Sequence, residues 1–162
     1  VDYLLDTSQW KKAIKAFKKV PVPLRGGVSE AEFEAAVFLE KDLEDYLVKN
    51  LNLIEPGIRL IKRQKRIEIG SLDLFCRATN GDTVVVELKK VRASDKVFGQ
   101  LCRYIGCIRA HHSKPKEKVR GYIIGSDIDD KLRYAASVAP KGIVKLRRFR
   151  HDPANASIFI EA

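Results

Sequence analysis

Residues 83–90, TVVVELKK, carry an acid and a base at the end of an apolar run. Alternate side chains of a β-strand point to the same face, so we expect Glu87 and Lys89 to lie side by side. A second acid, Asp73, precedes this run, and the intervening residues 79–82, TNGD, are typical of a hairpin turn. The sequence therefore offers two carboxylates and one amine that a hairpin could bring together.

The length of the turn decides whether the two acids meet. A two-residue turn at residues 80–81 places Asp73 opposite Leu88, facing away from Glu87. A three-residue loop at residues 79–81, with its glycine in the left-handed region and a bulge, places Asp73 directly opposite Glu87. The sequence is compatible with both loops.

Two facing carboxylates repel each other unless a positive charge lies between them. Mg²⁺ prefers one or two protein carboxylates together with water and phosphate oxygens. Beside such an ion, Lys89 could hold or help deprotonate a metal-bound water. The other interpretation is that Asp73 and Glu87 form ordinary ion pairs with Lys89 or Arg77.

These segments resemble a known group of nucleases. GSLDLFCRATNGDTVVVELKK (70–90), followed by GQLCRY (99–104), is similar to the PD-(D/E)xK nuclease superfamily, and more narrowly to the catalytic domain of the NucS (EndoMS) endonucleases and their DUF91-type relatives. LEKDLEDYLVKNLNLIEPG (39–57) resembles the helix that precedes the site in those enzymes. The resemblance covers about residues 39–149 and leaves 1–38 outside it.

The resemblance implies a metal-dependent DNA endonuclease that hydrolyses phosphodiesters with a metal-activated water, in DNA repair, processing or restriction. Asp73 and Glu87 would bind Mg²⁺, with Mn²⁺ as a substitute, and Lys89 would orient the water. The first motif departs from the family pattern, because Leu72 stands where the superfamily has a nominal proline.

The resemblance also assigns roles to three helical residues. Glu40 would complete the acidic cluster, with Glu44, one turn further on, as the rival for that position. Gln100 and Tyr104 match the family's Q-x-x-x-Y pattern and would support Lys89 or a phosphate. Ordinary helix packing is the other interpretation of Gln100 and Tyr104.

The formal net charge of +10 favours a polyanionic partner, although charge alone does not choose among DNA, RNA and an anionic membrane. No segment is typical of a base-reading helix, so we expect the protein to contact DNA mainly through phosphates. The substrate could be single-stranded, branched or mismatched DNA. A homodimer is compatible with the sequence. An alternative function is a nucleic-acid-binding module without turnover. The expected DNA-contacting residues are Arg63, Lys65, Arg66, Lys90 and Arg103.

The order of patterns predicts an α/β fold with a restriction-endonuclease-like core, in which a mixed sheet of hairpin strands and parallel crossovers is flanked by helices. The nuclease-like domain is expected at residues 29–162, after a basic N-terminal helix and a Pro/Gly linker at 1–28. The expected elements are helices at 29–50, 95–112 and 127–139, and strand regions at 59–78, 83–90, 119–125, 142–149 and 157–160.

Other features bear on location and cofactors. No apolar run is long enough to cross a membrane, although the basic amphipathic segment 10–19 could pack on the fold or lie on DNA or a membrane surface. Three cysteines without C-x-x-C spacing argue against a disulfide framework and a zinc site, and favour reduced thiols in the cytoplasm. The pair at 111–112, HH, is interpreted as part of a solvated loop.

Overall fold

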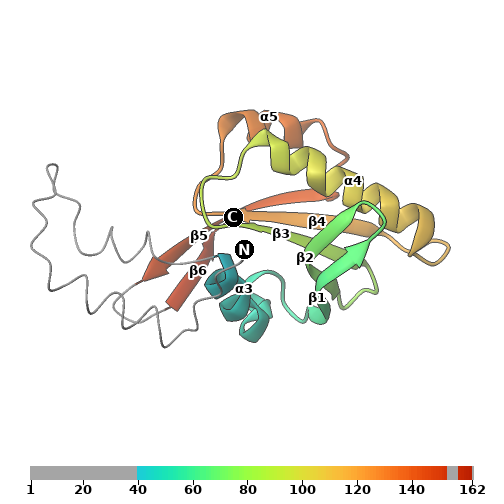
Figure 1. Cartoon of the computed structure of the whole chain (residues 1–162), viewed down its shortest axis with the longest axis horizontal. Helices are drawn as coiled ribbons and strands as arrows, with labels where there is room; N and C mark the ends of the chain where they lie inside the picture. The colour runs from blue at the N-terminus through green and yellow to red at the C-terminus, as the bar shows by residue number, and fades with distance from the viewer. Residues whose placement is uncertain (1–39, 153–156, 162) are drawn as a thin grey trace, which may run out of the picture. The chain divides into compact units, whose positions relative to one another are not determined.

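The computed structural model describes residues 40–152 and 157–161. These residues form a six-stranded mixed sheet in the order β1-β2-β3-β4-β5-β6, with helices on both faces (Figure 1). The predicted α/β class is confirmed, whereas the predicted N-terminal helix and linker at 1–28 lie outside the described residues. The strands are β1 (Arg59–Ile67), β2 (Gly70–Arg77), β3 (Thr83–Lys89), β4 (Val119–Gly125), β5 (Val144–Asp152) and β6 (Ser157–Glu161), and the helices are α3 (Glu40–Lys49), the 3₁₀ turn η1 (Leu51–Leu53), α4 (Asp95–His111) and α5 (Asp130–Ser137).

Strand directions follow from the connections. β1, β2 and β3 are antiparallel neighbours joined by short turns. β3, β4 and β5 are parallel, and α4 and α5 supply the crossovers that parallel strands require. β6 returns antiparallel to β5 at the edge of the sheet. The predicted arrangement of hairpins followed by crossovers is confirmed.

The sheet separates two apolar layers, because β3 is buried on both faces. On one face, Val86 of β3 packs in a cluster with Leu43 and Leu47 of α3. On the other face, Val85 packs in a cluster with Leu101 of α4, and α5 joins the same layer. Figure 1 shows α3 on one side of the sheet and α4 with α5 on the other. β3 is therefore a rigid central strand that cannot easily change register.

The β2–β3 hairpin has the three-residue loop. Leu74 pairs with Val86, and the Ala78 N–H donates to the Asp82 carbonyl at 2.9 Å. Gly81 has a φ of +89°, the left-handed conformation that this loop requires at its last position. The register observed from Leu74 to Arg77 is that of the three-residue loop, and the two-residue turn is ruled out.

Some boundaries differ from the predicted ones. The strand region 59–78 divides into two strands at a turn, and Gly70 begins the second strand with a φ of +150°. α5 begins only at Asp130, because the Asp129 carboxylate accepts a hydrogen bond from the Lys131 N–H and caps the helix there. Propensity alone gives helix ends to within a few residues.

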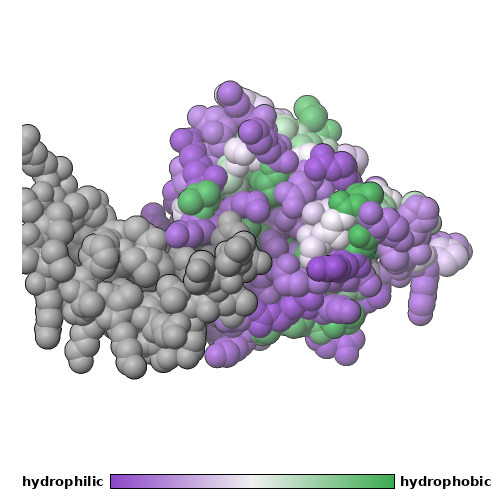
Figure 2. Space-filling model, in the orientation of Figure 1, coloured by the Kyte–Doolittle hydropathy of each residue, from purple (hydrophilic) through white to green (hydrophobic). Residues whose placement is uncertain are grey.

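The face drawn in Figure 2 is predominantly hydrophilic, with hydrophobic side chains in separate small patches. Among the described residues, no helix is long and apolar enough to cross a membrane.

Candidate active site

The site forms where β2 and β3 diverge. Regular pairing ends at Leu74 and Val86, one step before Asp73 and Glu87. Beyond that step the Leu88 N–H donates to the Asp73 carboxylate, with a distance of 2.8 Å from the Leu88 N to Oδ2. A side-chain acceptor thus replaces the backbone carbonyl, which fixes the Asp73 carboxylate against the end of β3.

Glu87 and Lys89 occupy that end of β3. Glu87 is 1% exposed, an unusual degree of burial for a carboxylate, and β4 covers its strand by parallel pairing of Glu87 with Ile123. Lys89 is half-buried, and its positive charge acts to lower the pKa of Asp73. Asp73, Glu87 and Lys89 thus all belong to the end of the β2–β3 hairpin that lies away from the loop.

Burial controls the ionisation of Asp73. Desolvation raises the pKa of its carboxyl above the ordinary 3.8, and the nearby charge of Glu44 acts in the same direction. Hydrogen bonds from the Leu88 N–H and the Gln64 amide, together with the Lys89 charge, oppose this rise without cancelling it. Two shielded carboxylates on adjacent strands are a donor set that suits a hard divalent cation such as Mg²⁺.

Gln64 of β1 connects two acids of the site. Its Nε2 lies 2.7 Å from Oε2 of Glu44 and 3.3 Å from Oδ1 of Asp73, so one amide donates to both carboxylates. Ser71 donates to the Gln64 carbonyl oxygen at 3.5 Å, which is consistent with that orientation of the amide. Gln64 also has a φ of +43°, a left-handed conformation that is costly for a residue with a side chain. No pattern in the sequence indicates this role, because a glutamine inside a basic strand is usually solvent-facing.

Glu44, on α3, is the helical acid whose side chain the structure places beside the site. It is 7% exposed and also accepts a hydrogen bond from Nε of Arg63 at 2.6 Å. The other end of the Arg63 guanidinium binds Asp45. Glu40 begins α3, but its side chain lies outside the described residues, so its predicted role stays a prediction.

Gln100 and Tyr104 lie one turn apart on α4, and the Gln100 amide is 3.1 Å from the Tyr104 hydroxyl. Tyr104 is buried, and its hydroxyl reaches the start of β2, where a Cβ on Gly70 would come within 2.7 Å of it. Gly70 therefore leaves room for this hydroxyl. This hydrogen bond joins Gln100 to Tyr104, and the Tyr104 hydroxyl lies against the start of β2.

The predicted DNA-contacting residues lie in different surroundings. Arg63 is already held by two carboxylates, and the Lys65 ammonium lies 4.5 Å from the centre of the Phe75 ring. Arg66 and Arg103 are exposed, and Lys90 is half-buried. Among the described residues, Arg63 would have to break ion pairs to bind a phosphate, whereas no such ion pair holds the exposed Arg66 and Arg103.

Sequence comparison identifies relatives over most of the described region. Residues 39–151 match the family described as the Endonuclease NucS C-terminal domain. The chain is 31% identical to Endonuclease NucS of Frankia alni over 139 residues, which is 82% of this chain and 62% of that protein. It is 33% identical to Endonuclease NucS of Sulfolobus acidocaldarius over 91 residues, which is 56% of this chain and 35% of that protein. The chain therefore spans less than two thirds of either relative.

Solved structures agree. A structure described as an EndoMS–dsDNA2 complex matches with a TM-score of 0.60 and 27% identity, over 67% of this chain and 43% of that chain. A repair endonuclease from Pyrococcus abyssi matches with a TM-score of 0.54 and 25% identity, over 75% of this chain and 47% of that chain. The shared part is thus less than half of each solved chain.

Proposed function

Because the chain belongs to the Endonuclease NucS C-terminal domain family, we propose that it is a Mg²⁺-dependent DNA endonuclease that acts in DNA repair. One observation carries the proposal. The three-residue loop with Gly81 in the left-handed conformation sets the register of β2 against β3, and the Asp73 carboxylate accepts from the Leu88 N–H, next to Glu87 and Lys89 in the chain. This register supports the proposal, because the two-residue turn would have turned Asp73 away from Glu87.

The roles of the residues follow from their surroundings. Asp73 and Glu87 would hold the metal, because both are shielded from water and one backbone N–H already fixes the Asp73 carboxylate. Mg²⁺, when bound, would supply Lewis-acid chemistry to the phosphate and to the attacking water. Lys89 would orient that water and place positive charge beside the phosphate as negative charge develops.

The remaining residues of the site would position these groups. Gln64 and Glu44 would hold the Asp73 carboxylate in place, since the Gln64 amide donates to both acids. Gln100 and Tyr104 would fix the start of β2 against α4. Each of these residues acts through another side chain, so its loss should cost less than the loss of Asp73 or Glu87.

Duplex DNA is the proposed substrate class. The match to a solved EndoMS–dsDNA2 complex and the net charge of +10 both support it. The exposed Arg66 and Arg103 would meet phosphates and give an affinity that falls steeply with salt.

The test is a cleavage assay of the 162-residue chain on single-stranded, branched, mismatched and fully paired DNA, and on RNA, with Mg²⁺, Mn²⁺ or a chelator. We expect cleavage of DNA with either metal, its loss with the chelator, and its loss in Asp73→Ala and Glu87→Ala. Asp130→Asn is a matched control, because this acid has an 80% exposed side chain on α5 and should cut like the parent.

Calorimetric Mg²⁺ binding, measured on the same variants, separates the metal site from turnover. Mg²⁺ binding that is lost in Asp73→Ala, without cleavage by the parent, would support the metal site and limit this chain to a binding role. Salt-sensitive DNA binding that ignores both Mg²⁺ and the loss of Asp73 would overturn the proposal in favour of a module without turnover.

A further inference from the structure

A second group of metal-binding side chains lies away from Asp73 and Glu87. It consists of Glu68, in the turn between β1 and β2, with Cys107 and His112 at the C-terminal end of α4. The three side chains each present one ligand atom, and these atoms all lie within 4.8 Å of one another. Glu68 and His112 are exposed and Cys107 is half-buried, so the group is open to solvent.

The distances within this group are close to those of a coordination shell. The His112 Nε2 lies 2.9 Å from the Glu68 Oε2, and the Cys107 Sγ lies 3.3 Å from the same oxygen. A tetrahedral Zn²⁺, with metal–ligand bonds of about 2.0 to 2.3 Å, separates its ligand atoms by about 3.3 to 3.7 Å. The two separations from the Glu68 oxygen are within about half an ångström of this range, and the separation of the Cys107 and His112 ligand atoms is at most 4.8 Å. Rotation of the exposed Glu68 and His112 side chains would bring the three atoms around a shared ion.

The chemistry of the group favours a borderline-soft cation. Glu68 and His112 could form an ion pair by themselves, but the Cys107 thiol also contacts the Glu68 carboxylate. Thiolate, imidazole and carboxylate are the three side-chain types that bind Zn²⁺ in proteins, whereas Mg²⁺ and Ca²⁺ select oxygen ligands. The C-terminal end of a helix also favours a positive charge through the helix dipole.

We propose that Glu68, Cys107 and His112 form a binding site for Zn²⁺ or a similar transition-metal ion, with water completing the shell. On binding, the metal–sulfur bond forms as the Cys107 thiol releases its proton to solvent, and no redox change occurs. The site is independent of the proposed nuclease function. It also revises the expectation, drawn from cysteine spacing alone, that no zinc site is present, because its ligands come from segments far apart in the sequence.

Binding at this site would join the β1–β2 turn to α4. Cys107 lies on α4 one turn after Tyr104, whose hydroxyl already touches the position of Gly70 at the end of that turn. The metal would thus hold the two segments together from a second point. We expect it to raise the melting temperature of the protein, because a ligand that binds the folded state stabilises it.

Co²⁺ titration followed by absorption is the most direct test. A cysteine thiolate bound to Co²⁺ gives a charge-transfer band in the near ultraviolet, which carboxylate ligands such as Asp73 and Glu87 do not produce. We expect this band to saturate at one equivalent in the parent and to be displaced by Zn²⁺. Cys107→Ser should abolish the band and weaken Zn²⁺ binding at least about 100-fold, and His112→Ala should weaken binding similarly.

Cys102→Ser is the matched control, since Cys102 is an exposed cysteine on the same helix and outside the group. It should keep the cobalt band and the rise in melting temperature with Zn²⁺. Circular dichroism of each variant checks that the fold is intact; Cys107 is half-buried, so its replacement by serine should be tolerated. A parent without the band, or a band that survives in Cys107→Ser, would overturn the proposal.

Discussion

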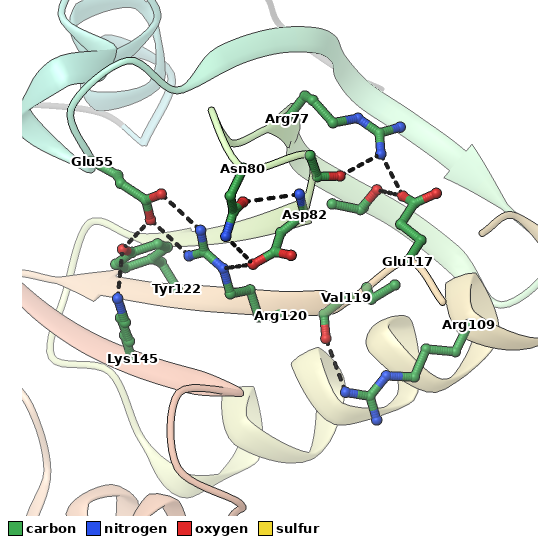
Figure 3. A network of polar contacts seen from close by, with 12 residues as sticks. Glu55, Arg77, Asn80, Asp82, Arg109, Glu117, Val119, Arg120, Tyr122 and Lys145 are labelled. Carbon is green, nitrogen blue, oxygen red and sulfur yellow. Dashed lines mark hydrogen bonds and ion pairs between the residues drawn. The ribbon is translucent and has the colours of Figure 1, made fainter. Parts of the chain in front are cut away.

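The two ends of the β2–β3 hairpin hold acidic side chains in opposite electrostatic settings. At the loop end, Asp82 and Glu55 both bind the guanidinium of Arg120, at 2.9 and 2.7 Å, and Tyr122 donates to Glu55 (Figure 3). At the open end, the hydrogen bonds to Asp73 come from neutral groups, the Leu88 N–H and the Gln64 amide. We call these the arginine network and the candidate site.

The difference is visible in the acids themselves. The Arg120 guanidinium lowers the pKa of Glu55 to about 2, so this carboxylate is fully satisfied as an anion. Burial instead raises the pKa of Asp73, so a bound cation would stabilise the ionised form of this carboxylate. A carboxylate that is ion-paired with an arginine stabilises the fold, whereas a buried carboxylate that is hydrogen-bonded only to neutral groups can still bind a metal ion.

The largest expected effect is at the candidate site. Asp73→Asn should reduce DNA cleavage at least about 1,000-fold, equivalent to about 4 kcal/mol of transition-state stabilisation, because the neutral amide is a poor metal ligand. The free energy of unfolding should change by less than about 1 kcal/mol, because the removal of a buried charge offsets the loss of the hydrogen bond from Gln64, while an oxygen remains to accept from the Leu88 N–H. Cleavage assays and urea denaturation measure the two effects, and a marked loss of stability would contradict the comparison.

The reverse result is expected in the arginine network. Arg120→Met should lower the free energy of unfolding by about 3 kcal/mol, because Glu55 and Asp82 lose a largely buried partner. Cleavage at a temperature where the variant is still folded should be nearly that of the parent. Arg133→Met is the control, since its 3.9 Å ion pair with Asp130 is exposed and its loss should cost less than about 0.5 kcal/mol.

Most of the fold was predictable because local patterns and global packing agree. The apolar run of β3, the glycine of the loop and the crossover helices all indicate the same mixed sheet. Gly81 decided the register, although the sequence alone did not show that the three-residue loop would be preferred. Whether the loop has two or three residues depends on which pairing of β2 with β3 packs best in the whole sheet.

The candidate site was less predictable than the fold. Asp73, Glu87 and Lys89 carry a recognisable spacing, and the observed hairpin register is the one that this spacing needs. Gln64 carries no such spacing, because it reaches Asp73 across a strand pair and through an unusual backbone conformation. Interactions between strands distant in sequence, such as this one, cannot be read from periodicity.

A smaller effect should appear at acid pH. The pKa of Glu55 falls from 4.5 to about 2 on folding, so its stabilising contribution is complete above the unfolded value and is lost as the pH falls from about 4.5 to about 2. We expect this loss to be on the order of 1–2 kcal/mol, because Glu55 is partly exposed. In Glu55→Gln the pH dependence over this range should be flatter, as measured by urea denaturation at several pH values. An unchanged slope would show that Arg120 does not hold this carboxylate as an anion in solution.

The smallest effect distinguishes the two roles of Gln64. Gln64→Ala and Gln64→Gly both remove the amide that joins Glu44 to Asp73, so both should lower the rate of cleavage by a similar factor, roughly tenfold. Their stabilities should differ, because alanine keeps the cost of a φ of +43° and glycine does not. The glycine variant should therefore be the more stable of the two by about 1 kcal/mol. If alanine were the more stable residue, β1 would not hold this left-handed conformation in solution, and Gln64 would act at the candidate site without backbone strain.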